Sequence, residues 1–400
     1  MKKELAEKTG GRIPARKGEQ KSKILELPVE NKVKNRTMID YTFLFIVVLM
    51  VCVGMVMLLS ASTPAARTKY ANSYYFFNKQ LLFVVVGFIG MTVASFVDYK
   101  IYKKYARYIF SVALFLLFIV AIPGIGIKLN GSRRWLPFPG FNFQPSEIMK
   151  LSIAILFASW IEDNRFGIKT FYGSLWYYGV VGIVSVLMLL EPHLSGTIVI
   201  AGIGVVIMIA SGTPLKPIGI AVPVVGSVGV VAISLFDPGR FSRLLRFLDP
   251  FSDLQRTGYQ ISQALYAIGS GGIFGKGLGR SVQKYSYLPE PYNDFIFAVV
   301  CEELGMIGAV LIIGLFGALI YRGMKIAFSA PDKFSSLLVV GIMSQIAIQT
   351  IFNIAVATSS IPNTGVSLPF FSYGGTAIMI LLCEMGIVLN ISRHALKKKD

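Results

Sequence analysis

The sequence predicts an all-α, polytopic membrane protein with about ten transmembrane helices and one large extracytoplasmic loop between the seventh and eighth helices. Of the 400 residues, 54% are hydrophobic and only 15% are charged, whereas a soluble domain carries about 25% charged residues. The apolar residues also gather into separate runs of about 20, the length that a helix needs to cross a bilayer. Short breaks with polar residues, Pro or Gly separate these runs.

Ten apolar runs have the length of membrane spans. They cover, in chain order, residues 39–61, 80–97, 108–127, 145–161, 171–190, 195–211, 215–235, 295–321, 334–357 and 373–392. The breaks at Glu191 and Gly212 are short, so the fifth, sixth and seventh runs are the hardest to separate. We expect a membrane domain over 37–393, a disordered basic cytoplasmic tail over 1–36 and a second basic tail over 394–400. The first tail either orients the first span or contacts acidic lipid headgroups or a cytosolic partner.

Lysine and arginine are unevenly distributed among the loops. The first 36 residues contain eleven Lys or Arg against five Glu, and basic residues also follow the second, fourth, eighth and tenth runs. Short cytoplasmic loops carry an excess of these residues, so we expect both termini to be cytoplasmic. The extracytoplasmic face then holds the loops 128–144, 191–194, 237–294 and 358–372. This bias explains most of the net charge of +18, and since no basic-aromatic module is visible, we expect no nucleic-acid partner.

The loop 237–294 is both long and basic, and loops of this length are usually functional. It contains seven cations: Arg240, Arg243, Arg246, Arg256, Lys276, Arg280 and Lys284. Long loops cross the membrane regardless of their charge, so one interpretation gives these cations no ligand. The other interpretation is that they meet an anion at the outer membrane face.

Two adjacent arginines precede a tryptophan in the loop 128–144. Arg133 and Arg134 offer planar, bidentate donors that suit a phosphate headgroup, and Trp135 favours the membrane interface. An interfacial anchor without a ligand explains the same residues equally well. Both interpretations place these side chains at the membrane surface.

A lysine follows in the predicted start of the fourth span. Lys150 lies three residues after Glu147, so both share one helix face. A lysine inside the membrane needs a counter-charge, and the candidates are Glu147, Glu302 and Glu303. We expect structural ion pairs among these groups, with substrate binding by Lys150 as the alternative.

The segment 289–305 concentrates acidic residues at the edge of the eighth run. Glu290 and Asp294 lie in a proline-containing loop, and Glu302 and Glu303 lie inside the run. Ionisable groups at membrane depth usually face a cavity, a partner or a reaction. Asp294 either caps the helix or acts as a general base, because a partly dry membrane edge raises the pKa of a carboxyl group.

The loop 358–372 and the residues after it are rich in Pro and Gly, which predicts a rigid turn. Ser372 supplies a hydroxyl group there but no base poised near neutral pH, so we interpret this loop as a scaffold or substrate cradle. His193 and His394 lack metal-ligand spacing, and no Ser-His-Asp or Cys-His set is visible. The sequence therefore predicts no metal held by protein ligands alone.

Four segments in this order resemble the SEDS family (shape, elongation, division and sporulation), whose members include FtsW, RodA and SpoVE. They are 130–135 with 144–147, 191–197, 289–305 and 362–376, and the resemblance covers roughly residues 38 to 393. The basic N-terminal extension is more similar to FtsW than to RodA. The second segment departs from the family pattern, which usually begins Gln-Pro-Asp-Leu-Gly-Thr, because Glu191 and His193 replace the Gln and Asp and Ser195 is inserted.

The resemblance implies a peptidoglycan glycosyltransferase of the bacterial cytoplasmic membrane that polymerises lipid II for cell division or cell shape. The family's essential acid falls on Asp294. Its partners would be a class B penicillin-binding protein, which crosslinks the strands, and other divisome or elongasome membrane proteins.

From this resemblance we expect Asp294 to take a proton from the acceptor sugar, and we expect basic side chains to stabilise the departing pyrophosphate. The candidate substrate-binding residues are Arg133, Arg134, Arg243, Arg246, Glu290, Lys150 and Ser372. No cofactor is certain, although a divalent cation (Mg²⁺ or Mn²⁺) could share the pyrophosphate. A lipid II flippase and a scaffold that recruits a transpeptidase are the alternatives.

Overall fold

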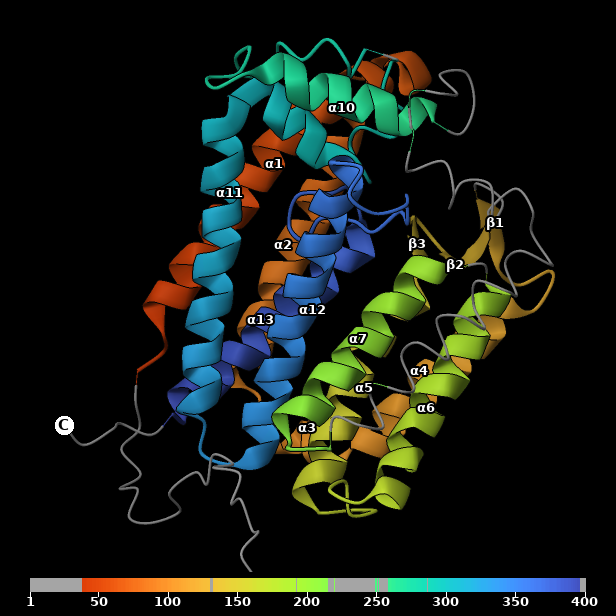
Figure 1. Cartoon of the computed structure of the whole chain (residues 1–400), viewed down its shortest axis with the longest axis vertical. Helices are drawn as coiled ribbons and strands as arrows, with labels where there is room; N and C mark the ends of the chain where they lie inside the picture. Colours follow the sequence, from red (N-terminus) through yellow and green to blue (C-terminus); the bar gives the residue numbers. More distant parts are fainter. Residues whose placement is uncertain are drawn as a thin grey trace, which may run out of the picture. The chain divides into compact units, whose positions relative to one another are not determined.

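The computed structural model describes residues 38–129, 132–191, 193–214, 219, 249, 251, 258–285 and 287–395. These residues form a helical bundle with a small antiparallel sheet beside one end (Figure 1). The elements, in chain order, are α1 (Tyr41–Tyr70), α2 (Tyr75–Phe96), α3 (Lys100–Lys104), α4 (Ala106–Ala121), β1 (Ile127–Leu129), β2 (Ser132–Phe138), β3 (Phe141–Phe143), α5 (Pro145–Glu162), α6 (Phe171–Leu190), α7 (Leu194–Ala210), α10 (Tyr259–Gly271), α11 (Ile296–Phe328), α12 (Lys333–Ala357) and α13 (Gly375–Arg393).

Nine of the ten predicted spans coincide with helices, and the seventh, 215–235, lies outside the described residues apart from Gly219. Within the described ranges, six helices are long and apolar enough to cross a membrane: α1, α2, α6, α11, α12 and α13. Helices α4 and α7 are apolar but shorter, and α5 contains Glu147, Lys150 and Glu162. The chain is therefore a mostly helical, multi-pass protein.

Several predicted span boundaries are wrong: α2 begins at Tyr75, not at residue 80, and α11 continues to Phe328, not to residue 321. Helix α1 continues past the predicted end at Ala61 to Tyr70, through Pro64, because residues such as Ala66 remain buried in the bundle. The third span was expected to reach Ile127, but α4 ends at Ala121, just before a Pro-Gly pair. Proline removes a helix hydrogen bond and glycine weakens a helix, so the apolar character of the following residues does not extend it.

The small sheet has the order β1-β2-β3 and occupies most of the predicted loop 128–144. Strand β2 pairs with β1 and β3, with Ile127 opposite Trp135 and Leu136 opposite Phe143. Gly140 has a positive φ of 88° in the turn between β2 and β3, a conformation that glycine adopts without steric cost. The sheet fixes Arg133 and Arg134 on β2, just before α5 begins.

Glycines allow the helices of the bundle to approach closely. Helix α13 packs along α2 (Figure 1). A Cβ atom at Gly386 would lie 2.3 Å from the Met91 carbonyl oxygen, and one at Gly87 would lie 2.7 Å from a methyl group of Leu382. Close approach at small residues is a common way to pack helices in membranes.

Polar contacts show which helix ends meet at the end of the bundle that carries α3. Asp40, just before α1, accepts from Arg322 near the end of α11 at 2.8 Å, and its backbone amide donates to the hydroxyl oxygen of Ser392 in α13 at 3.2 Å. Tyr99, between α2 and α3, donates to Asp332 before α12 at 2.5 Å. Lys103 of α3 pairs with Glu162 at the end of α5. We call this the basic end, and α10 and the sheet lie at the other end (Figure 1).

Candidate active site

Asp294 lies in the loop just before α11, at the end of the molecule opposite the basic end. The N-cap residue of α11 is Phe295, and it makes no side-chain capping bond. The carboxylate of Asp294 accepts no hydrogen bond that the described residues supply, so its side chain does not cap the helix. Of the two roles considered from the sequence, the capping role is therefore not the one that the structure shows.

The backbone around Asp294 is held by another helix and by the loop 358–374. Asn353 of α12 donates to the carbonyl oxygens of Asp294 at 2.8 Å and Val366 at 2.7 Å. The amide of Tyr373 donates to the carbonyl oxygen of Tyr292 at 2.9 Å. The Tyr373 bond joins the loop before α11 directly to the loop before α13, and Asn353 links the same two loops through α12, so the position of Asp294 depends on both loops.

Ser372 belongs to the same junction. Its hydroxyl group donates to the carbonyl oxygen of Asn293 at 2.6 Å and accepts from the amide of Leu368 at 2.8 Å. The hydrogen of this hydroxyl is therefore already used within the protein. In this structure Ser372 serves as part of the scaffold, one of the two roles that the sequence indicated for its loop.

Gly365 lies directly against the carboxylate of Asp294. A Cβ atom at this position would be 3.2 Å from Oδ2 of Asp294, and Gly365 has a φ of +68°, which L side chains rarely adopt. A side chain here would press on the carboxylate and strain the backbone. The contact between Gly365 and Asp294 was not predicted, although the Pro and Gly residues of this loop indicated that the chain turns sharply there.

The charge environment of Asp294 suits proton transfer. Burial and the nearby Glu290 carboxylate raise the pKa of Asp294, and the positive charge of Arg134 opposes both, with a net pKa of about 6. Glu290 accepts a hydrogen bond of 2.6 Å from the side chain of Asn293 and has a positive φ of 50°. A general base is most effective when its pKa lies near the working pH, so Asp294 can gain and lose a proton under mild conditions.

Of the four candidate arginines, the structure brings Arg134 into electrostatic range of Asp294. Arg133 is its neighbour on β2 and is half-buried. Adjacent residues of a strand point to opposite faces, so both cannot face the same group. Arg243 and Arg246 lie outside the described residues.

Arg134 acts electrostatically on a second acidic group as well as on Asp294. This group is Glu191, at the break between α6 and α7. Glu191 is buried, and neither of its carboxylate oxygens has a hydrogen-bonding partner among the described residues. Burial raises the pKa of Glu191 to about 8, and Arg134 opposes this shift. Burial and the positive charges of Arg134 and Lys150 lower the pKa of the adjacent His193. No role was predicted for this break, although titratable residues between two apolar runs were a signal that could have indicated one.

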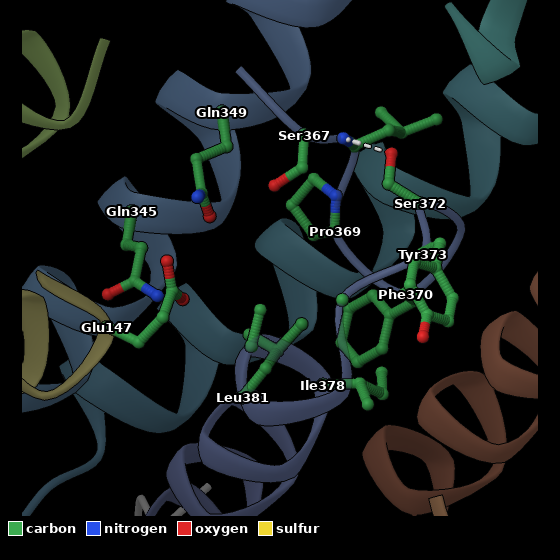
Figure 2. A pocket seen from close by; sticks show the side chains of 13 residues that line it. Glu147, Gln345, Gln349, Ser367, Pro369, Phe370, Ser372, Tyr373, Ile378 and Leu381 are labelled. Carbon is green, nitrogen blue, oxygen red and sulfur yellow. Dashed lines mark hydrogen bonds between the residues drawn. The ribbon is translucent and has the colours of Figure 1, made fainter. Parts of the chain in front are cut away.

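Lys150 and Glu147 form an ion pair of 2.8 Å inside the bundle, and both side chains are buried. Glu147 also lines a polar cavity of about 30 Å³ beneath the loop 358–374, together with Gln345 and Gln349 of α12. Figure 2 shows Glu147 and Gln345 side by side, across the cavity from Pro369. This volume is about that of one water molecule. Glu147 therefore faces a small interior cavity that would not accept a sugar.

Glu302 and Glu303 pair with two cations of the predicted outer loop. Lys276 contacts Glu302 and Lys284 contacts Glu303, each at 2.7 Å. Ser60 of α1 also donates to Glu303 at 2.7 Å. None of these contacts involves Lys150, so Glu147 is its counter-charge. Lys276 and Lys284 are thus occupied within the protein and do not need an external anion.

The two ion pairs lie next to a break in α11, because Glu302 and Glu303 come just before Gly305. At Gly305, φ is 67° and ψ is −167°. The carbonyl oxygens of Glu302 and Glu303 accept instead from the amides of Lys276 at 3.0 Å and Gly277 at 2.9 Å. The Gly272 carbonyl oxygen in turn accepts from the Met306 amide at 2.9 Å. The segment after α10 thus supplies the hydrogen bonds that the helix loses at its break.

Comparison with known proteins gives a consistent result. A family model described as "Cell cycle protein", for FtsW, RodA and SpoVE, matches residues 40–397. The chain belongs to this family. It is 39% identical to Stage V sporulation protein E of Bacillus subtilis (strain 168) over 90% of this chain and 98% of that protein. It is also 37% identical to a probable peptidoglycan glycosyltransferase FtsW of Geobacter sp. (strain M18), over 88% of this chain and 96% of that protein.

Two solved structures share the fold. One, of a peptidoglycan synthase complex described as coordinating polymerization and crosslinking, matches with a TM-score of 0.74 and 25% identity over 89% of this chain and 98% of that chain. The other, the Rod shape determining protein RodA of Thermus thermophilus, matches with a TM-score of 0.64 and 26% identity over 90% of this chain and 98% of that chain. The family membership predicted from four sequence segments is therefore confirmed. Because relatives with the names SpoVE and FtsW are similarly identical, the likeness does not separate these groups.

Proposed function

We propose that this chain is a peptidoglycan glycosyltransferase that polymerises lipid II into glycan strands at the outer face of the bacterial cytoplasmic membrane. Similar proteins with the name probable peptidoglycan glycosyltransferase FtsW support this proposal. The observation that carries it is the setting of Asp294: a partly desolvated carboxylate close to Arg134, held where two loops meet. Lipid II carries both groups that such a site needs, a sugar hydroxyl and a pyrophosphate.

In the proposed reaction, Asp294 removes the proton from the 4-hydroxyl group of the acceptor sugar. The freed oxygen attacks the anomeric carbon of the donor sugar, and the bond between that carbon and the pyrophosphate oxygen breaks. Undecaprenyl pyrophosphate leaves with the bonding electrons, and Arg134 stabilises its negative charge. Arg133, Arg243 and Arg246 are further candidates for this role. Charge placed in advance of the reaction is often the largest catalytic contribution.

The proposed topology has ten membrane helices, both termini in the cytoplasm and a large extracytoplasmic loop over 237–294. The position of basic residues supports this orientation, because Lys103, Arg322 and Arg393 all lie at the basic end. Cytoplasmic loops are enriched in such residues. Asp294 lies at the opposite end, which is then extracytoplasmic, where the lipid-linked sugar would be polymerised.

We further propose a class B penicillin-binding protein as partner, in association with other divisome or elongasome membrane proteins. The solved complex that shares this fold is described as coordinating polymerization and crosslinking, which is the combination such a partner would provide. A divalent cation, Mg²⁺ or Mn²⁺, could share the pyrophosphate with Arg134. Among the described residues no three His, Cys, Asp or Glu side chains gather as metal ligands, so such an ion would be bound mainly through the substrate.

The decisive experiment uses purified protein and fluorescent lipid II in detergent, where the sides of the membrane are lost. We expect glycan polymer from the unaltered chain and a reduction of about 10²- to 10⁴-fold for Asp294→Asn. Asp98→Asn is the matched control, because Asp98 is an exposed carboxylate beside α3 at the basic end. Equal polymerisation by both variants would refute the role of Asp294 as the base.

The same material separates the two alternatives. Absence of polymer together with headgroup translocation in liposomes would favour a lipid II flippase, a class to which the buried Lys150–Glu147 pair would also be suited. Absence of both, with retained binding to a transpeptidase, would favour a scaffold.

A further inference from the structure

We propose that the basic end contains a binding site for the phosphate headgroup of an anionic phospholipid, formed by α3, α4 and the end of α5. Helix α3 lies at the other end of the bundle from α10 (Figure 1). Helix α10 packs against α11, which begins two residues after Asp294. The headgroup site does not depend on the proposed glycosyltransferase activity, because it requires only that the chain lies in a membrane.

The site is a cavity of about 640 Å³ between these elements. Five cations line it: Lys100, Lys103, Lys104, Arg107 and Arg165. A volume of this size falls in the range of small-molecule sites, and it greatly exceeds the polar cavity of about 30 Å³ beneath the loop 358–374. Positive charge in loops is explained by orientation in the membrane alone, but a hollow lined by that charge is not.

One of the five cations is neutralised within the protein. Lys103 contacts Asp163 at 3.0 Å and also pairs with Glu162. Asp163 is the acidic residue of the cavity lining and Glu162 is its neighbour, so the single charge of Lys103 offsets one of these two carboxylates. Lys100, Lys104, Arg107 and Arg165 then give the cavity an excess of positive charge. An arginine fork binds phosphate oxygens in bidentate fashion, and lysine binds them as a point charge.

An apolar surface continues from the cavity along α4. Tyr108 lines the cavity and is 71% exposed, and Val112 and Phe115 follow on the same helix at 57% and 61% exposed. The spacings of four and three residues place these side chains on one face of the helix. A lipid matches both parts, with its headgroup phosphate in the cavity and its acyl chains against α4. A free phosphate would contact the cations but not this apolar surface of α4.

The depth of the cavity also fits a headgroup. Helices α4 and α5 begin or end at the cavity, so it lies at the level where membrane helices leave the hydrocarbon core. Basic pockets between membrane helices on the cytoplasmic side bind anionic headgroups, at a gain that corresponds to roughly fivefold in affinity for each cation. Removal of two cations should therefore weaken binding on the order of 30-fold.

The test is a titration of the delipidated full-length protein in detergent with dioctanoyl-phosphatidylglycerol. Dioctanoyl-phosphatidylcholine and inorganic phosphate are the comparison ligands, and the double variant Lys104→Gln, Arg107→Gln removes two lining cations. The matched control is Lys169→Gln, Lys325→Gln, which removes the same charge outside the cavity lining, from the loop before α6 and from the last turn of α11. We expect saturable binding of the phosphatidylglycerol that weakens on the order of 30-fold in the first variant and is unchanged in the control.

Three outcomes would overturn the proposal. Equal binding of the two lipids would show that the net negative charge of the headgroup is not recognised. Equal losses in both double variants would show that general surface charge is responsible. Inorganic phosphate that binds as tightly as the phosphatidylglycerol would assign the cavity to a soluble phosphate. Each readout is lipid or phosphate binding, so failure of the polymerisation assay has no bearing on it.

Discussion

The two ion pairs at the break in α11 offer a controlled test of what burial does to a salt bridge in this bundle. Both have a nitrogen–oxygen distance of 2.7 Å, but Lys284 is 3% exposed and Lys276 is 32% exposed. Removing one partner of a buried pair costs about 3–5 kcal/mol, because the remaining charge is left without compensation. A pair with solvent access contributes only about 0–1 kcal/mol. We therefore expect Lys284→Met to destabilise the fold by about 3–5 kcal/mol. We expect a smaller loss for Lys276→Met, because Lys276 is partly exposed and the buried Glu302 keeps hydrogen bonds from Ser281, Val282 and Gln283.

The measurement is the free energy of unfolding in detergent micelles for both lysine variants, Glu303→Gln and the double variant Lys284→Met, Glu303→Gln. The double variant removes both buried charges, so it should be more stable than the sum of its two single changes predicts. Ser60, which also contacts Glu303, remains in every variant. If Lys284→Met and Lys276→Met destabilise the protein equally, burial does not set the strength of these pairs. If the double-mutant cycle gives no coupling energy, the contact between Lys284 and Glu303 does not contribute to the free energy of unfolding.

Three further predictions concern Asp294 and its surroundings. Because the pKa of Asp294 is raised to about 6, polymerisation should increase as the pH rises through about 6 and the base loses its proton; a flat profile in initial-rate assays would contradict this. Gly365→Ala should keep the protein folded but reduce polymerisation at least tenfold, because the new Cβ atom would lie 3.2 Å from the carboxylate of Asp294. Gly212→Ala has a similarly positive φ of 86° with open space around it, so it should lose stability alone, and equal activity losses would argue against a local effect. The folded-state pKa of Glu191 is raised from 4.5 to about 8, so the folded state binds the extra proton and stability should fall as the pH rises from about 4.5 to 8; thermal unfolding of Glu191→Gln should lack this part of the slope.

The sequence predicted those elements whose signal is local. Helix α6 covers the apolar run at 171–190 and begins with Thr170 as a capping residue. The sheet was missed because β1 and β3 have three residues each, too few to show an alternating pattern. The break at Gly305 was missed because apolar residues continue through it on both sides. The break depends on the segment after α10, which supplies the hydrogen bonds that the helix loses there, and this contact is not evident from the sequence.

The candidate site was predicted in the same uneven way. Asp294 stood out because a carboxylate at the edge of an apolar run is costly. Its supporting residues did not, because Asn353 lies 59 residues away along the chain and Gly365 acts through the absence of a side chain. Glu147, Glu302 and Glu303 were likewise all candidate counter-charges for Lys150. The structure pairs Lys150 with Glu147, whereas Lys276 and Lys284 pair with the other two. Which cation pairs with which carboxylate depends on how the chain between them folds, and the sequence alone does not show how far apart the two side chains lie.

The arrangement around Asp294 explains how a single carboxylate can be placed accurately on a loop. Its carbonyl oxygen is fixed by Asn353, and its neighbour Asn293 is fixed by Ser372. The first turns of α11 that follow it are tied to a second segment at the Gly305 break. The backbone at and beside Asp294 is therefore held from α12 and from the loop before α13, while its carboxylate stays without a hydrogen-bonding partner among the described residues. A base that is held by its backbone and open at its side chain needs little reorganisation when it accepts a proton, which is the condition under which placed charge contributes most to catalysis.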